Sequence, residues 1–366
     1  MLLPTEHAKR TRGVVRALGV DDIPALVALR RRAFTQSERA TPERSAAFFR
    51  EVFFENPWRD AELPSLIYEN ANGEVAGFLG SLPRTMVSGG RVIRIAIGTQ
   101  LMVAPEDPGL AGRRLLRAFM DGPQDLSLGD TANDAARRLW ASIGGHSSAL
   151  LSLSWVRRLR PWRQRMRELG RGPAAMGLQL ATAPACALLD RLAVRRLLRF
   201  APDARAYPLT AADICEIQDD VLSGFTLRPR YDVPSLAWLL SRAGEKRQFG
   251  PLHSARVVDR YGEPLGWYMY HLGKDGTAHV LQIAARRRRE AHVLQRLYRD
   301  AWDRGAVTVS GRAEAWLMRT LLDDDSVFVY QGPWTLLHAR KPALSEQLER
   351  DTSYFSRLDG EWWLSF

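Results

Sequence analysis

Apolar and polar residues follow the same order of patterns in the two halves of the chain. Residues 14–34 predict a short strand and then a helix, because apolar side chains return at helical spacing after a pair of aspartates. Residues 204–225 repeat this plan, with Thr210 and Asp213 ahead of the apolar helical positions. Two matching strand–helix units indicate an internal repeat.

Two further features recur in the same order. A glycine-acid turn joins two predicted strands at residues 73–74 in the first half and at residues 262–263 in the second half. A central apolar strand follows each of these hairpins, at residues 101–105 and 281–285. Three repeated features, separated by a nearly constant number of residues, favour two copies of one fold over a chance agreement of short turns.

The repeat predicts a division of the chain into four parts. We expect a first domain at 13–150, a basic and apolar linker region at 151–204, a second domain at 205–345 and a docking tail at 346–366. The tail ends in a cluster of aromatic and leucine side chains. Since an exposed apolar cluster of this kind would promote aggregation, we expect the tail to dock into a groove between domains or subunits.

Composition and charge narrow the class of protein. The 366 residues are 46% apolar and 25% charged, which is ordinary for a globular protein of about two domains. The net charge of +11 comes almost entirely from arginine and favours anionic partners. Cys186 and Cys215 are too few for a disulfide framework, and the first residues lack a signal-peptide pattern. We therefore expect a cytoplasmic protein.

The stretch from Ile95 to Gly145 predicts two strand–turn–helix units in succession. In each unit, small residues lead from a buried strand into a helix. The first amide groups of such a helix have no carbonyl partners, and the helix dipole adds positive potential. A turn of this kind can hold a diphosphate.

The same stretch resembles the two sequence signatures of the GNAT acyltransferases, which move an acyl group from acyl-coenzyme A to an amine. The first signature is matched by Val103-Ala104-Pro105-Glu106, Gly112 and Leu115-Leu116, with Asp107 and Leu110 as departures that a loop using Gly109 would reduce. The second signature is matched by Asn133, Ala136, Leu139 and Gly144, with Trp140 in the usual tyrosine position and Gly145 in the phenylalanine position.

The resemblance implies an α/β fold of two tandem GNAT-like domains, each a mixed, mostly antiparallel sheet flanked by helices. It also implies an acyl-coenzyme A site in the first domain and no metal. The implied cofactor-binding residues are Leu101, Met102, Val103, Gly109, Leu110, Ala111, Gly112, Arg113, Arg114, Asn133, Ala136 and Trp140. The second copy carries Arg286 to Arg289 where the first has small residues, so we expect it to be degenerate.

The residue that deprotonates the amine is not identified by the sequence. The strand from Ile95 to Met102 carries no carboxylate, which leaves Asp130, Glu69 and His146 as candidates. Trp140 replaces the family's tyrosine, and its indole N–H can donate a hydrogen bond but cannot act as an acid. The histidines show no metal-ligand spacing, and no hydrolase elbow, phosphate loop or dinucleotide motif is present.

Residues 151–204 permit several interpretations. Arginines crowd around Trp155 and Trp162, and a largely apolar run follows at residues 173–189. A solvated pair of linker helices is one interpretation, and an anionic membrane surface that binds residues 155–200 is another. Nucleic acid is disfavoured because no binding module is recognisable.

The leading hypothesis is an N-acyltransferase that uses acetyl-coenzyme A or another acyl-coenzyme A, and whose acceptor is a small-molecule or peptide amine. The main alternative is a non-catalytic binding or scaffold protein of the same fold, peripheral to a membrane or in cell-envelope polysaccharide metabolism. Transfer from aminoacyl-tRNA, which occurs in tandem proteins of this kind, would also suit the basic charge.

Overall fold

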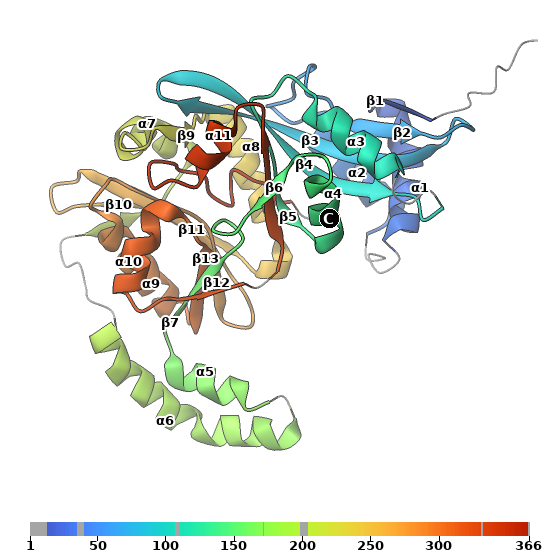
Figure 1. Ribbon diagram of the computed structural model, residues 1–366. Coiled ribbons are helices and arrows are strands. Elements are labelled where there is room, and N and C mark those ends of the chain that lie inside the picture. Colours follow the sequence, from blue (N-terminus) through green and yellow to red (C-terminus); the bar gives the residue numbers. More distant parts are fainter. Residues whose placement is uncertain are drawn as a thin grey trace, which may run out of the picture.

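The computed structural model describes residues 13–34, 40–106, 110–170, 172–197, 204–330 and 332–364, and contains two mixed sheets with helices packed on them (Figure 1). The first sheet has the order β1-β2-β3-β4-β5-β15-β6, with β9 beside β3. Its strands are β1 Val14–Ala17, β2 Leu66–Glu69, β3 Val75–Ser88, β4 Arg91–Val103, β5 Leu126–Ala132, β6 His146–Ser148, β9 Leu227–Pro229 and β15 Trp334–Ala339. The second sheet has the order β14-β7-β13-β12-β11-β10-β8. Its strands are β7 Ser154–Arg158, β8 Arg205–Tyr207, β10 Leu252–Val258, β11 Pro264–Leu272, β12 Thr277–Ala285, β13 Thr308–Arg312 and β14 Val327–Val329.

Helices cover both faces of the first sheet. The helices are α1 Ile23–Ala33, α2 Pro42–Phe53, α3 Leu110–Met120, α4 Asp134–Ala141, α5 Pro161–Glu168, α6 Pro173–Leu197, α7 Ala211–Val221, α8 Val233–Gly244, α9 Glu290–Asp303, α10 Met318–Asp323 and α11 Pro342–Leu348. A side chain at Gly80 would collide with Phe53 of α2, and one at Gly77 would collide with Leu115 of α3. Because residues an odd number apart on a strand point to opposite faces, α2 and α3 lie on opposite sides of β3.

The two sheets repeat one plan, as the sequence predicted. β1-β2-β3-β4-β5 in the first sheet corresponds in order to β8-β10-β11-β12-β13 in the second. All neighbours in these runs are antiparallel except the last pair, β4 with β5 and β12 with β13, which are parallel. The predicted fold class, mixed and mostly antiparallel sheets flanked by helices, is therefore confirmed.

The sheets also exchange strands, which the sequence pattern does not reveal. β15 comes from residues 334–339, within the expected second domain, yet it pairs with β5 and β6 of the first sheet. β7 comes from residues 154–158, at the start of the expected linker region, yet it pairs with β13 and β14 of the second sheet. Each sheet therefore depends on backbone hydrogen bonds from the other half of the chain.

The tail after α11 is packed into the interior. Tyr354, Phe355, Leu358 and Trp363 are almost fully buried. The tail contacts both halves of the protein, because the Tyr354 hydroxyl donates to the Ile283 carbonyl at 2.9 Å, and the Glu361 amide donates to Asp130 of β5 at 2.9 Å. The apolar end of the chain thus fills space between the two sheets up to Leu364.

α5 and α6 form a helical pair that stands away from both sheets (Figure 1). α6 continues through Pro184. No helix in the described ranges is both long and apolar enough to cross a membrane.

Candidate functional site

The first sheet divides at its parallel pair. β4 and β5 are in register only from Ile95 to Ile97, opposite Leu126 to Leu128. Beyond these pairs the two strands continue, to Val103 and Ala132, without further register contacts among the described residues. The strand edges that face each other across this gap carry backbone groups that an extended ligand can use.

A bulge in β4 bends the strand just where the gap opens. The register with β3 shifts between Phe78 and Gly80, and Gln100 adopts a positive φ of 53°. A bulge adds one residue to one strand and increases the local bend and twist. The bulge therefore turns β4 away from β5, and it lies beside the gap.

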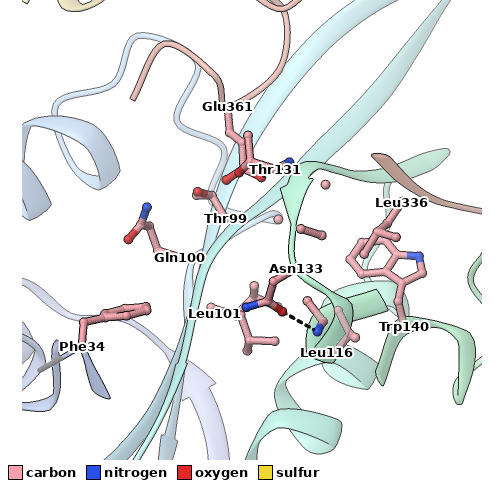
Figure 2. Close-up of a pocket in the computed structure, with 15 residues that line it drawn as sticks. Phe34, Thr99, Gln100, Leu101, Leu116, Thr131, Asn133, Trp140, Leu336 and Glu361 are labelled. Carbon is pink, nitrogen blue, oxygen red and sulfur yellow. Dashed lines mark hydrogen bonds between the residues drawn. The ribbon is translucent and has the colours of Figure 1, made fainter. Parts of the chain in front are cut away.

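The gap contains a cavity of about 230 Å³ (Figure 2). β4 contributes Gly98, Thr99, Gln100 and Leu101, and β5 contributes Gly129, Thr131 and Ala132. The rest of the wall comes from Phe34, Leu79, Leu116, Asn133, Ala136, Trp140, Leu336 and Glu361. A Cβ at Gly98 would lie 3.2 Å from the ring of Phe119, so this side of the cavity is tightly packed.

The first turn of α3 lies close to β4 and α4. Ala111 and Gly112 are buried, and a Cβ at Gly112 would lie 3.3 Å from Leu139 and 3.4 Å from Val103. Leu110 is 52% exposed, so its side chain does not fill the cavity. Gly109 lies outside the described residues. The small residues of the motif therefore allow α3 to approach the end of β4.

The two predicted arginines differ in their surroundings. Arg114 donates to the Gly13 carbonyl at 2.8 Å and lies 5.8 Å from the ring of Tyr68. Arg113 is exposed on the first turn of α3. Arg113 is therefore the arginine that remains available to an anionic ligand at the helix N-terminus.

Residues of β4 divide by strand alternation. Leu101 lines the cavity, Met102 is buried in the core, and Val103 packs beside Gly112. Met102 can therefore offer a ligand only its backbone.

Asn133 and Trp140 hold α4 against the cavity. The Asn133 side-chain oxygen accepts from the Ala136 amide at 2.9 Å and so caps the helix. Trp140 is buried, and its indole donates to the Leu337 carbonyl of β15 at 3.0 Å. Since this N–H is already used, Trp140 forms part of the wall and supplies no hydrogen bond to a ligand.

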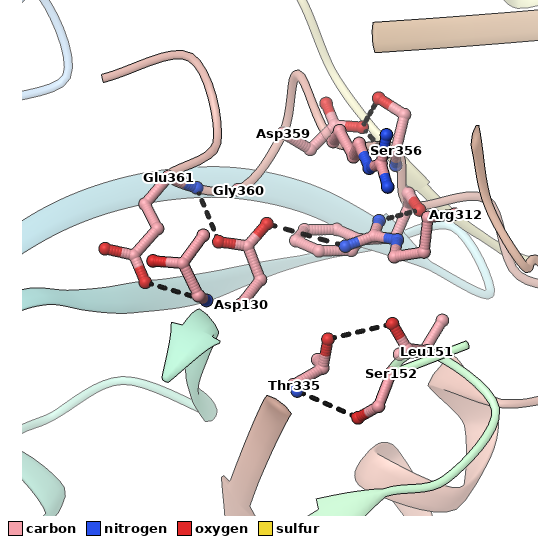
Figure 3. Close-up of polar contacts among 12 residues, drawn as sticks. Asp130, Leu151, Ser152, Arg312, Thr335, Ser356, Asp359, Gly360 and Glu361 are labelled. Atoms are coloured by element: carbon pink, nitrogen blue, oxygen red, sulfur yellow. Dashed lines mark hydrogen bonds and ion pairs between the residues drawn. The ribbon is translucent and has the colours of Figure 1, made fainter. Parts of the chain in front are cut away.

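The carboxylate of this cavity comes from the tail. Glu361 accepts from the Thr131 amide at 3.1 Å, and its own amide donates to Asp130 (Figure 3). Burial, and after it the neighbouring charge of Asp130, raises the pKa of Glu361 to about 7. Gly360 permits this approach, because a Cβ there would lie 1.9 Å from the Asp130 carboxylate.

The three candidate bases from the sequence lie elsewhere. Asp130 is buried behind Glu361 and 3.5 Å from Arg312, and burial raises its pKa. Glu69 pairs with Arg16 at 3.0 Å on the outer strands. His146 is exposed on β6. None of the three lines the cavity. The sequence did not identify Glu361. The only hint in the sequence was that the tail was expected to dock between domains.

The tail fills the equivalent gap in the second sheet. β12 and β13 are in parallel register only from Thr277 to His279. Beyond that point, the buried Gln282 donates to Ser356 of the tail at 3.0 Å, and Arg357 donates to the Val280 carbonyl at 3.3 Å. The second gap is therefore occupied by the protein's own chain.

The predicted arginine run of the second half is engaged at the surface. Arg286 pairs with Asp220, and Arg287 pairs with Asp351 at 3.1 Å. Among the described residues, no group of histidine, cysteine and carboxylate side chains is placed to hold a metal ion.

No protein-family model matches this sequence, and no curated protein matches it significantly. Solved structures do match. A GCN5-related N-acetyltransferase from Anabaena variabilis is 15% identical, with a TM-score of 0.58 over 89% of this chain and 72% of that one. A GCN5-related N-acetyltransferase from Kribbella flavida is 15% identical, with a TM-score of 0.55 over 89% and 71%. A conserved protein from Enterococcus faecalis is 12% identical, with a TM-score of 0.57 over 90% and 72%. This chain therefore has the fold of the GCN5-related N-acetyltransferases, the GNAT fold.

Proposed function

We propose that this GNAT-fold protein transfers an acyl group from acyl-coenzyme A to an amine, with the donor bound between β4 and β5. The observation that carries the proposal is the gap in the parallel pair, which has open strand edges along its sides and the buried carboxylate of Glu361 in its wall. The small cavity favours a short acyl chain, so acetyl-coenzyme A is the proposed donor.

Each part of the donor has a proposed contact. The pantetheine arm would lie along the open edge of β4, and hydrogen-bond to the backbone from Leu101 to Val103. The diphosphate would meet the first amide groups of α3, at Leu110 to Gly112, with Arg113 beside it. Asn133, Ala136 and Trp140 would line the thioester.

The reaction joins the amine nitrogen to the thioester carbonyl carbon and breaks the carbon–sulfur bond. Backbone N–H groups at the β4 bulge would stabilise the negative oxygen of the tetrahedral intermediate. Glu361 would accept the proton that the amine nitrogen loses. Coenzyme A would leave as the thiolate and take a proton from solvent, because the Trp140 indole is no acid and is bonded to Leu337.

Calorimetric titration with acetyl-coenzyme A tests the donor site, and absence of heat at millimolar ligand would refute it. Thiol release across a panel of amines then tests transfer.

One observation favours a second candidate function, a binding protein that does not catalyse transfer. Trp140 occupies the position of the family's acidic tyrosine, and its only polar hydrogen is committed to β15. Tight binding of acetyl-coenzyme A without thiol release from any amine would favour this alternative.

A further inference from the structure

A second cavity lies on the other side of the tail from the donor cavity. It has a volume of about 250 Å³ and lies between the two sheets. Its polar lining residues are Asp130, Ser152, Ser154, His279, Ser310, Arg312 and Arg357. Pro333 at its edge is exposed, which places part of the lining at the protein surface.

Two guanidinium groups dominate this second cavity. Arg312 is buried, lies 3.5 Å from Asp130 and leaves its Nε without a hydrogen-bond partner (Figure 3). Arg357 donates long hydrogen bonds to the Val280 carbonyl and the Ser154 hydroxyl, both at 3.3 Å, and its guanidinium lies 5.4 Å from the Trp362 ring. Burial, and after it the charge of Arg312, lowers the pKa of Arg357 to about 10. Asp130 is the one carboxylate in the lining, and the partly buried Glu314 outside it partly offsets the charge of the two arginines.

The wall between the two cavities is a single segment of chain. Glu361 faces the donor cavity, whereas the next residue, Trp362, lines the second cavity. On β5, Thr131 lines the first and Asp130 the second. A molecule in the second cavity is therefore separated from Glu361 by the side chain of Asp130 and the backbone of the tail.

We propose that the second cavity binds a small molecule that carries a carboxylate or phosphate group. The anionic group pairs with Arg312 and Arg357, since guanidinium groups bind both kinds of anion through paired hydrogen bonds. The Ser154 and Ser310 hydroxyls line the same cavity and offer further contacts.

Matched amines test the proposal without any need for turnover. β-Alanine is compared with β-alaninamide, and phosphoethanolamine with ethanolamine, by calorimetry on protein saturated with coenzyme A. We expect at least one anionic amine to bind tenfold or more tightly than its neutral counterpart. Equal binding within both pairs would overturn the proposal, whereas failure of acetyl-coenzyme A to bind would overturn the proposed function instead.

Variants locate the effect. Arg357→Gln removes one cation. Ser310→Val keeps both arginines, removes a hydroxyl from the lining and narrows the cavity, and valine suits a strand position. Both should abolish the preference for the anionic amine and leave the affinity for acetyl-coenzyme A unchanged. Arg299→Gln, an equal charge change on the exposed face of α9, is the control. A preference that survives Ser310→Val would place the anion site elsewhere and refute the assignment.

A separate observation concerns the α5–α6 pair. It exposes an unusual number of large apolar side chains, each between 39% and 74% accessible: Trp162, Leu169, Met176, Leu178, Leu180, Leu188, Leu189 and Leu192. Isolated proteins rarely leave so many such side chains in contact with water.

The charges on the pair are mostly positive at the surface, with Glu168 as the exposed acid of α5. Arg163, Arg165 and Arg167 are exposed on α5, and residues 172–189 contain no acid. Asp190 is buried, where it accepts from the Trp162 amide at 2.9 Å. Trp155 and Arg157, which the sequence grouped with this surface, are instead buried in β7.

We infer that the α5–α6 pair binds an anionic lipid surface, with its apolar side chains among the acyl chains and its arginines at the headgroups. The combination of exposed leucines with an excess of arginine over acid favours lipid over a protein partner. Co-sedimentation should show binding to vesicles of phosphatidylglycerol and little to phosphatidylcholine, with release at high salt.

Leu180→Asp and Leu188→Asp should abolish this binding, and Leu322→Asp, at an equally exposed leucine of α10, should not. Sedimentation velocity without vesicles provides the counter-test. A dimer that both α6 variants dissociate, together with absence of vesicle binding, would assign the surface to a second copy of the chain and overturn the inference.

Discussion

Replacement of Glu361 by glutamine should lower activity and raise stability at the same time. Burial raises the pKa of this carboxyl from 4.5 to about 7, so the ionised form that can accept a proton is disfavoured in the folded protein. The difference corresponds to about 3 kcal/mol of folding free energy. Glutamine keeps an oxygen for the Thr131 amide and carries no charge.

The direction of the pH effect follows from linkage. Between pH 4.5 and about 7 the folded wild-type protein holds a proton that the unfolded chain has released, so its stability falls as the pH rises through this range. In E361Q, residue 361 does not titrate, so this fall in stability with pH is absent. Its advantage in free energy of unfolding should therefore be small at pH 5 and about 3 kcal/mol above pH 7. Urea denaturation at pH 5 and pH 8 measures the difference.

Activity should change in the opposite direction. For the wild type, kcat/KM for the amine should rise with pH and level off above about 7, because the base must be ionised. In E361Q, kcat/KM for the amine should fall by a factor of about 100 to 10,000. Its rise with pH toward about 7 should also disappear. Glu346→Gln, which changes an exposed glutamate of α11, is the matched control. An E361Q protein that keeps wild-type kcat/KM with the same pH profile would show that another group accepts the proton.

Three further substitutions test the walls of the donor cavity. Asn133→Ala removes the cap of α4 and should lower the free energy of unfolding by about 1 kcal/mol, measured by urea denaturation, and weaken acetyl-coenzyme A binding in calorimetry. Trp140→Phe should cost about 1 to 3 kcal/mol in the same denaturation, since it leaves the buried Leu337 carbonyl without its donor; an unchanged midpoint would mean that this bond contributes nothing. Gly360→Ala should displace the tail from β5 and lower both the melting temperature and kcat, because its methyl group would overlap the Asp130 carboxylate; unaltered activity would show that the tail can shift without loss.

The sequence predicted some of the local structure around the cavity. Asn133 caps α4 where the motif indicated, whereas Ala111 and Gly112, expected ahead of a helix, lie inside the first turn of α3. These features depend on residues close together in the chain: a helix cap needs only its own first turn, and a glycine permits close approach wherever it lies. The repeated hairpins and the fold class were predictable for the same reason.

Contacts between distant segments were decided only by the tertiary structure. The carboxylate of the cavity, Glu361, lies 230 residues from its partner Thr131, and no spacing rule connects them. The role of Trp140 as a wall depends on β15, which crosses from the second half of the chain. Local pattern determined which segments form strands and helices here, whereas burial of the apolar tail between the sheets determined which side chains meet at the site, because that packing depends on the whole surface the tail covers.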